Sequence, residues 1–80
     1  MKKLDAIGKV CPIPLFYTKR KIEEMQIGEE IEVIADDPTV KETIPKWSRD
    51  HGHEILSIED IGDNQFRIVV RKKEDKKRFG

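Results

Sequence analysis

The sequence is poor in cysteine and contains only Cys11 among its 80 residues. A single thiol cannot form a disulfide within the chain, so a redox cycle between two thiols of one molecule is excluded. Any sulfur atom that reacts with Cys11 must therefore belong to another molecule.

Long apolar runs, a signal peptide and a net charge are also missing. Met1-Lys2-Lys3 leads directly into sequence typical of a folded domain, and no apolar stretch is long enough to span a membrane. Charged residues make up 40% of the chain, but the formal net charge is zero, so no overall field would attract nucleic acid or anionic lipid. We therefore expect a cytoplasmic protein that neither associates with membranes nor binds nucleic acid directly.

The length of the chain is sufficient for one small domain with a thin core. A chain of this size buries only about 60% of the surface that it exposes when unfolded. We predict a single domain over residues 1–71. The segment 72–80 is charged and shows no periodic pattern, which predicts a disordered tail.

The segment Gly8-Lys9-Val10-Cys11-Pro12-Ile13-Pro14 places the thiol where a loop enters a helix. Proline is tolerated in the first turn of a helix because its missing N–H would have no helical partner there. The start of a helix offers unpaired N–H groups and the positive end of the helix dipole, which favour thiolate over thiol. Cys11 is therefore the candidate nucleophile, and Gly8, Pro12 and Pro14 are the residues that shape its turn.

The two prolines also limit this activation. A residue before proline is disfavoured in the helical region, and this applies to both Cys11 and Ile13. If Cys11 caps the helix, Ile13 provides the main remaining N–H donor; if Ile13 caps it, Cys11 lies further out in the loop. In both cases we expect a partly activated thiol. The alternative is a buried and inert cysteine.

The first half of the chain has the pattern of a strand, a helix and a second strand. Residues 3–7 and 30–35 alternate apolar and polar side chains. Between them an amphipathic helix is predicted from Pro14 to about Gln26, with Gly28 just beyond its end. Its apolar stripe consists of Leu15, Thr18, Ile22 and Met25. This order predicts a β-α-β unit with parallel strands, in which the thiol lies at the carboxyl end of the first strand.

A second helix is predicted to follow Asp36-Asp37-Pro38. An acid–base pair or a metal site is conceivable for the two carboxylates, but an Asp cap followed by proline is the stronger interpretation. Pro45 is expected to interrupt the segment, giving a turn over residues 39–42 and the main helix over residues 43–51. Trp47 is expected on the inner face of this helix.

Two strands are predicted to complete the chain. The first covers residues 54–59, the second begins at Phe66, and Gly62-Asp63-Asn64 supplies the turn between them. His51 and His53 lie one residue apart, as metal ligands can. A site would need a third donor, and only Cys11 could supply a further His or Cys ligand, so we expect no metal and no cofactor.

Taken together, these segments resemble the TusA/SirA/YedF family of small sulfur-carrier proteins. The resemblance implies an α+β fold, a two-layer α/β sandwich in the order β-α-β-α-β-β, with two helices packed on one face of a mixed four-stranded sheet. It rests on motifs in a fixed order: Leu4-Asp5, Gly8, Cys11-Pro12-x-Pro14, Gly28-Glu29, Asp36-Asp37-Pro38, Ile44-Pro45 and Gly52-His53-Glu54.

The resemblance also implies a function. In the TusA branch, the family cysteine accepts sulfane sulfur as a persulfide from a cysteine desulfurase and passes it to an acceptor protein, in a relay that ends in thiolation of a tRNA wobble uridine. On this sequence Cys11 would be the carrier, as part of a sulfurtransferase-like carrier rather than a stand-alone enzyme. Candidate contacts with partner proteins are Phe16, Lys19, Arg20 and Asp37.

Two other functions remain open at this point. The chain could be a regulatory module that binds RNA or a signalling protein through the sheet or the basic tail, with Cys11 as a structural residue. It could also be a redox sensor that forms intermolecular disulfides under peroxide. The motifs do not separate the TusA branch of the family from the YedF branch.

Overall fold

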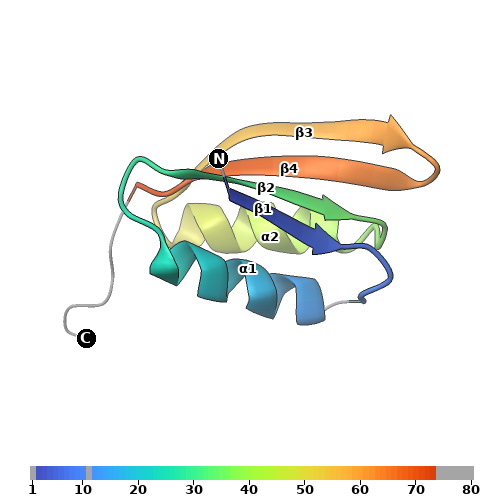
Figure 1. Ribbon diagram of the computed structural model, residues 1–80, viewed down its shortest axis with the longest axis horizontal. Coiled ribbons are helices and arrows are strands. Elements are labelled where there is room, and N and C mark those ends of the chain that lie inside the picture. The colour runs from blue at the N-terminus through green and yellow to red at the C-terminus, as the bar shows by residue number, and fades with distance from the viewer. Residues whose placement is uncertain (1, 11, 74–80) are drawn as a thin grey trace.

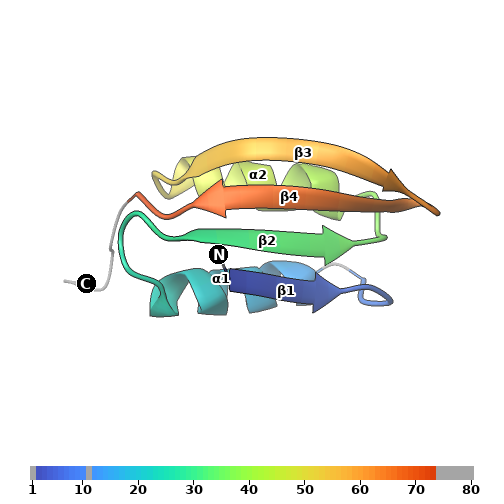
Figure 2. The same ribbon diagram turned by 45° about the horizontal axis from the view of Figure 1, so that its top comes forward.

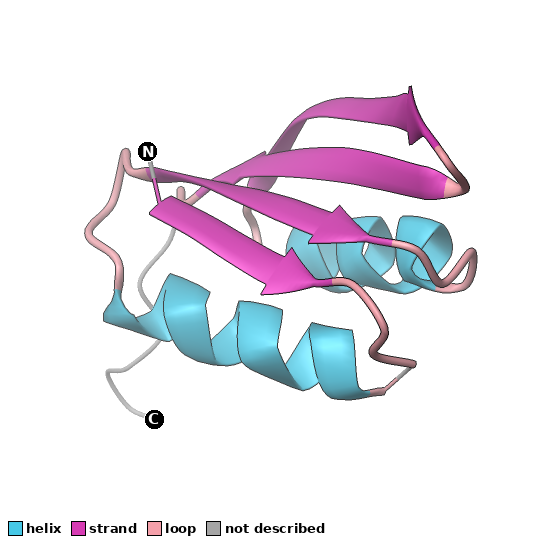
Figure 3. Ribbon diagram, turned by 45° about the vertical axis from the view of Figure 1, so that its right-hand side comes forward, coloured by secondary structure: helices cyan, strands magenta, loops and turns pink. Residues whose placement is uncertain are grey.

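The computed structural model describes residues 2–10 and 12–73, in which six elements follow one another (Figure 1). They are β1 (Lys2–Ala6), α1 (Ile13–Glu24), β2 (Glu30–Ala35), α2 (Val40–Asp50), β3 (Glu54–Gly62) and β4 (Gln65–Arg71). Both helices cover the same face of a single sheet (Figure 3). The predicted α+β sandwich and its element order are confirmed.

The sheet has the strand order β1-β2-β4-β3 (Figure 2). β1 and β2 are parallel, and their pairing ends with Ala6 opposite Ala35. β4 runs antiparallel to β2 on one side and to β3 on the other. The sheet is therefore mixed, and the parallel pair joined through α1 is the predicted β-α-β unit.

The core lies between the sheet and the two helices. Alternate residues of a strand point to opposite faces, so the buried positions of β2 and β4 mark the side that the helices cover. The predicted stripe of α1 contributes the buried Thr18, Ile22 and Met25, with Leu15 partly buried. The remaining buried hydrophobic residues of this cluster are Ala6, Ile31, Val33, Ala35, Val40, Ile44, Phe66, Ile68 and Val70.

The turns predicted from glycine are confirmed at two places. Asp63 and Asn64 both have positive φ, as a two-residue turn between right-twisted strands requires. At the end of α2, Gly52 has φ +82, and the N–H of His53 donates to the carbonyl of Ser48 across 2.8 Å. This is a Schellman arrangement, which satisfies carbonyls that have no partner inside the helix.

Pro45 lies inside α2, so the predicted break into a turn over 39–42 and a helix over 43–51 is wrong. Proline removes one hydrogen bond from a helix interior and crowds the preceding turn. In this helix the Pro45 ring is buried, and the neighbouring Ile44 and Ser48 are fully buried. Packing against the sheet therefore offsets the local cost of the proline.

The fold continues past the predicted domain end at residue 71. Lys72 is only 2% exposed, its N–H donates to the carbonyl of Glu29 across 2.9 Å, and its carbonyl accepts from the N–H of Gly28 across 2.7 Å. Lys72 therefore belongs to the fold rather than to the tail, while residues 74–80 lie outside the described part. No helix among the described residues has the length and apolar character needed to cross a membrane.

Candidate functional site

The loop between β1 and α1 lies at one end of the molecule. The β2–α2 connection and the β3–β4 hairpin are at the same end (Figures 1 and 2). Cys11 lies outside the described residues. The surrounding chain is defined by Gly8 to Val10 on one side and by Pro12 to Phe16 on the other. These neighbours determine what the loop can present to a partner.

Gly8 gives the loop its first bend. Its φ is +81, and the N–H of Lys9 donates to the carbonyl of Ala6 across 3.1 Å. A positive φ at the third residue of such a turn is the signature of type II, which favours glycine. A Cβ on Gly8 would have no atom within 4 Å, so the backbone conformation, and not a lack of space, calls for glycine.

The start of α1 differs from both alternatives considered for the helix cap. Pro12 is the N-cap residue, and it has no side-chain hydrogen bond to the helix. The N–H of Ile13 donates to the carbonyl of Val10 across 2.9 Å. Because Pro12 and Pro14 have no N–H, this bond uses one of the few donors of the first turn. The dipole of α1 remains, and the first turn contains no acidic residue that would oppose a nearby anion.

Exposed apolar side chains flank the cysteine in sequence. Val10 is 65% exposed, Ile13 38% and Phe16 53%. Pro14, in contrast, is buried against the core. The helix start is therefore anchored through Pro14, while the side chains of Val10, Ile13 and Phe16 stay exposed.

Three of the four predicted partner contacts lie close together on α1. Phe16, Lys19 and Arg20 are separated by three and four residues, which places them on one side of a helix. The Lys19 Nζ lies 5.9 Å from the centroid of the Phe16 ring. Arg20 is exposed and Lys19 half-buried. The helix thus presents an aromatic ring with two cations beside it.

Asp37, the fourth predicted contact, lies apart from this group at the β2–α2 connection. It is half-buried, and its Oδ1 accepts a hydrogen bond from the N–H of Thr39 across 3.1 Å. The N–H of Val40 donates to the main-chain carbonyl of Asp37 across 2.9 Å. Asp37 therefore shapes the turn that leads into α2. The expected Asp cap is not found on the helix itself, because the N-cap of α2 is Thr39, which makes no side-chain hydrogen bond to the helix.

The histidines lie at the opposite end of α2. The Trp47 ring, which packs half-buried against the core, has its centroid 4.5 Å from that of His51 and 5.6 Å from that of His53. His53 Nδ1 accepts from the N–H of Lys73 across 3.3 Å. In the described residues, no group of three or more His, Cys, Asp and Glu side chains has the arrangement of a metal site.

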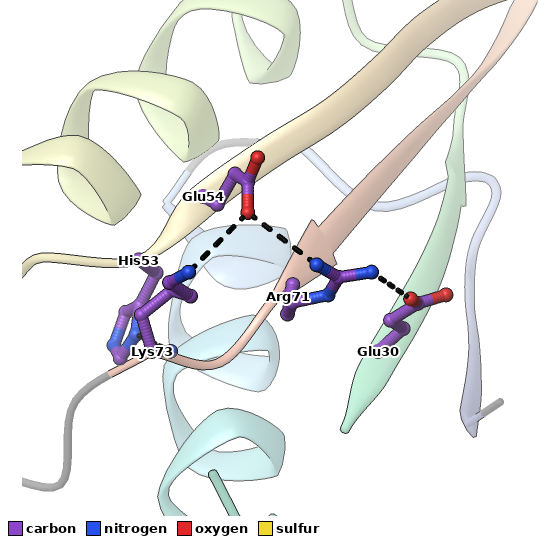
Figure 4. A network of polar contacts seen from close by, with 5 residues as sticks. All are labelled: Glu30, His53, Glu54, Arg71 and Lys73. Atoms are coloured by element: carbon purple, nitrogen blue, oxygen red, sulfur yellow. Dashed lines mark hydrogen bonds and ion pairs between the residues drawn. The ribbon is translucent and has the colours of Figure 1, made fainter. Parts of the chain in front are cut away.

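The sheet face away from the helices carries a network of paired charges around Arg71 (Figure 4). Arg71 Nη2 lies 2.9 Å from Glu30 Oε2 on β2, and its Nη1 lies 3.7 Å from Glu54 Oε1 on β3. Lys73 Nζ reaches the same Glu54 oxygen across 3.7 Å. The hydrogen bond to Glu30 raises the pKa of Arg71.

Arg67 repeats this arrangement further along β4. Its guanidinium pairs with Glu59 on β3, and its Nη1 lies 3.2 Å from Glu32 Oε2 on β2. The hydrogen bonds to Glu59 and then Glu32 raise the pKa of Arg67. Each sheet arginine is thus matched with carboxylates of both neighbouring strands, which makes this face a poor anion-binding surface.

Sequence reasoning did not identify Asp36 as part of this site. Its Oδ1 accepts a hydrogen bond from the N–H of Gly8 across 3.1 Å and so joins the cysteine-bearing loop to the end of β2. The parallel register could have suggested this contact, because strands that end opposite one another bring the residues that follow them close together.

Comparison with known proteins gives consistent results. The family model described as "Sulfurtransferase TusA" matches residues 2–72. A protein of Thermotoga maritima named "Putative sulfur carrier protein" is 43% identical over 72 residues, which cover 90% of this chain and 91% of the relative. A protein of Escherichia coli named "Putative sulfur carrier protein TsuB" is 39% identical over 72 residues, covering 90% of this chain and 96% of that protein.

A solved structure supports the fold. The crystal structure of a SirA-like protein from Desulfitobacterium hafniense superposes with a TM-score of 0.84. The match covers 92% of this chain and all of the other chain, at 23% sequence identity. At that identity the likeness concerns the fold alone.

Proposed function

The chain belongs to the TusA sulfurtransferase family, and from this premise we propose that it carries sulfane sulfur as a persulfide on Cys11. The observation that carries the proposal is the position of the one thiol in the sequence, between the exposed Val10 and Ile13 at the start of α1. A thiol that exchanges sulfur with other proteins needs exposed apolar surface around it, on which those proteins can dock.

The proposed chemistry is two successive thiol–disulfide-type exchanges. In the first, the Cys11 thiolate attacks the outer sulfur of a persulfide on a cysteine desulfurase, and the donor cysteine leaves as a thiolate. In the second, a thiolate of the acceptor protein attacks the outer sulfur of the Cys11 persulfide and releases the Cys11 thiolate. Each step breaks one sulfur–sulfur bond and forms another, so no cofactor, oxidant or reductant is consumed.

The dipole of α1 would assist both steps by favouring the thiolate, which is the attacking group in the first step and the leaving group in the second. The assistance is limited because Pro12 and Pro14 lack an N–H and Ile13 donates to Val10. Moderate activation suits a carrier, since a thiolate that is stabilised too strongly attacks more slowly.

Docking of the partners is assigned to the outward side of α1. Phe16 supplies apolar area, and Lys19 and Arg20 supply positive charge, which fits a partner surface with an apolar centre and acidic surroundings. Asp37 is assigned a separate contact with a cation of the donor. Separate alanine substitutions, compared for desulfurase affinity, test each of the four; a residue whose loss leaves the dissociation constant unchanged has no docking role.

The destination of the sulfur is assigned, on the family resemblance, to thiolation of a tRNA wobble uridine through the acceptor protein. The relay is placed in the cytoplasm, where free thiols stay reduced. Nucleoside analysis of tRNA from cells with and without the gene tests this destination. Unchanged levels of the thiolated uridine would direct the sulfur to another product without affecting the carrier role.

Binding of RNA through the sheet is disfavoured by the paired charges there. Arg67 and Arg71 each contact two carboxylates, so neither of these two described arginines is left unpaired for an anionic ligand. An RNA titration at two salt concentrations distinguishes the sulfur carrier from the RNA-binding regulatory module. Affinity that survives Cys11→Ser and depends steeply on salt would favour the regulatory module.

Intact-protein mass spectrometry tests the carrier function directly. After incubation with a cysteine desulfurase and cysteine, without reductant, the chain should gain the mass of one sulfur atom. The gain should disappear with dithiothreitol and should not occur in Cys11→Ser. Absence of the gain in the unaltered chain would overturn the proposal, and an intermolecular disulfide formed under peroxide without any persulfide would point to a redox sensor.

A further inference from the structure

The hydrogen bond from the N–H of Gly8 to Asp36 Oδ1 links two parts of the chain that are 28 residues apart. Gly8 lies in the loop that leads to the cysteine, and Asp36 directly follows the last residue of β2. The link exists because β1 and β2 are parallel and end in register, with Ala6 opposite Ala35. Both alanines are fully buried, which fixes the positions from which the two connections leave the sheet.

The other hydrogen bonds between described residues in the loop 7–10 stay within the neighbouring sequence. The N–H of Ile7 donates to Asp5 Oδ1 across 3.0 Å, and the N–H of Lys9 donates to the carbonyl of Ala6. The carbonyl of Val10 accepts from the N–H of Ile13. Among the described residues, the contact with Asp36 is therefore the bond that ties this loop to a different part of the fold.

We infer that Asp36 is a positioning residue for sulfur transfer, which holds the loop of Cys11 against the β2–α2 connection. This inference rests on the proposed carrier function. Exchange between two sulfur atoms needs the attacking, central and leaving sulfurs close to a line, so the orientation of the loop within a docked complex affects the rate. Asp36 acts through Gly8 and makes no contact with the reacting atoms.

Two substitutions separate the hydrogen bond from the charge. Asp36→Asn keeps a side-chain oxygen that can accept from Gly8, whereas Asp36→Ala removes it. The hydrogen bond lies at an exposed position, so its net contribution to holding the loop is small. We therefore expect Asp36→Ala to slow sulfur transfer from the desulfurase only about fivefold. Asp36→Asn should stay within about twofold of the unaltered chain. Asp50→Ala, which removes a 59% exposed carboxylate at the other end of α2, is the matched control and should have no effect.

Two further measurements exclude a purely electrostatic or purely structural role. The rate at which iodoacetamide alkylates Cys11 should show the same pH midpoint in all variants. If Asp36 acted through its charge, both Asp36 variants would shift that midpoint to lower pH, because removal of a nearby negative charge favours the thiolate. Hydrogen exchange of the Gly8 amide should accelerate in Asp36→Ala while the amides of β2 and β4 keep their protection.

The possible failures are distinguishable. If the unaltered chain gains no sulfur, the carrier function fails, and hydrogen exchange at Gly8 still reports whether Asp36 holds the loop. If the unaltered chain gains sulfur and Asp36→Ala transfers it equally fast, or if Asp36→Asn is as slow as Asp36→Ala, the positioning role is overturned. A loss of protection throughout the sheet in Asp36→Ala would show general destabilisation and would also overturn it.

Discussion

Lys72 Nζ donates a hydrogen bond to the main-chain carbonyl of Met25 across 2.6 Å, so a residue that follows β4 satisfies the C-terminal end of α1. The same Nζ lies 3.4 Å from the carbonyl of Glu23. A cation at this end of a helix interacts favourably with the helix dipole as well as with the unpaired carbonyls. The helix that follows the cysteine in sequence is thus held at its far end by a nearly buried lysine.

Lys72→Met should therefore destabilise the fold. The thioether keeps the apolar stem but leaves the carbonyl of Met25 without this donor, and hydrogen bonds to charged groups contribute about 1.5–3 kcal/mol. We expect a loss in this range by urea unfolding. Lys73→Met is the control, because its Nζ is half-exposed and reaches Glu54 only at 3.7 Å, so it should change the stability by less than about 0.5 kcal/mol. Equal stability of the two variants would contradict the capping role.

Gly8→Ala should cost stability through backbone strain alone. Gly8 has φ +81 and no atom near the position of a Cβ, and a non-glycine residue in this region costs about 1–2 kcal/mol. Gly28→Ala is the matched control, since Gly28 has φ +97, equally open surroundings and a position on the other side of α1. Both variants should lose similar stability by thermal melting.

The two glycine variants should differ in sulfur transfer. Only Gly8 lies in the turn that leads to Cys11, so Gly8→Ala should slow persulfide loading while Gly28→Ala should load normally at a temperature where both are folded. Equal loading rates in the two variants would show that the geometry of this turn does not matter for transfer.

Phe16→Ala should weaken binding to the sulfur donor with little effect on stability. Phe16 is 53% exposed, and loss of a central aromatic contact typically costs an interface about 2 kcal/mol, close to thirtyfold in affinity. Ile27→Ala is the control, because Ile27 is 61% exposed but lies beyond the opposite end of α1. Calorimetric titration with the desulfurase measures both, and an equal loss of affinity would place the interface elsewhere.

The contribution of Arg67 to the free energy of unfolding should not depend on pH between 7 and 10. Hydrogen bonds to Glu59 and then Glu32 raise the pKa of Arg67 above its ordinary, already strongly basic value. A group with a raised pKa in the folded state contributes fully below its unfolded pKa and loses that contribution only as the pH passes the folded value. The difference in unfolding free energy between the unaltered chain and Arg67→Met should therefore stay constant from pH 7 to 10. A decline within this window would show that another group controls the pairing.

Local conformational preferences predicted much of the element order. The alternation in residues 30–35, the stripe containing Thr18 and Ile22, and the turn at Gly62-Asp63-Asn64 all appear in the structure. These features depend on neighbouring residues and on the period of burial, which a sequence displays directly. The family resemblance supplied the mixed four-stranded sheet, but the strand order β1-β2-β4-β3 came only from the structure, because periodicity does not specify which strands pair.

At Pro45 the local backbone preference for a helix break does not decide the structure. Its effect on the backbone favours a break, but burial of its ring and of Ile44 keeps α2 continuous. Lys72 shows the converse, since a lysine at the start of a charged run is typical of a tail and yet lies buried against Met25. In both cases the outcome depends on burial in the tertiary structure, which becomes visible only when the elements are packed.

The sequence by itself determined that the chain has one thiol, that prolines frame it, and that a loop and a helix meet there, because chain composition and φ preferences are local properties. Only the tertiary structure decided that Asp36 accepts a hydrogen bond from the N–H of Gly8 and that Arg67 and Arg71 pair with carboxylates. It also decided that Lys72 caps the C-terminal end of α1. These bonds, apart from the Arg67–Glu59 and Arg71–Glu54 pairs across the β3–β4 hairpin, join residues 28 to 49 positions apart. Their formation depends on the register of the sheet and the packing of α1, which no single segment encodes.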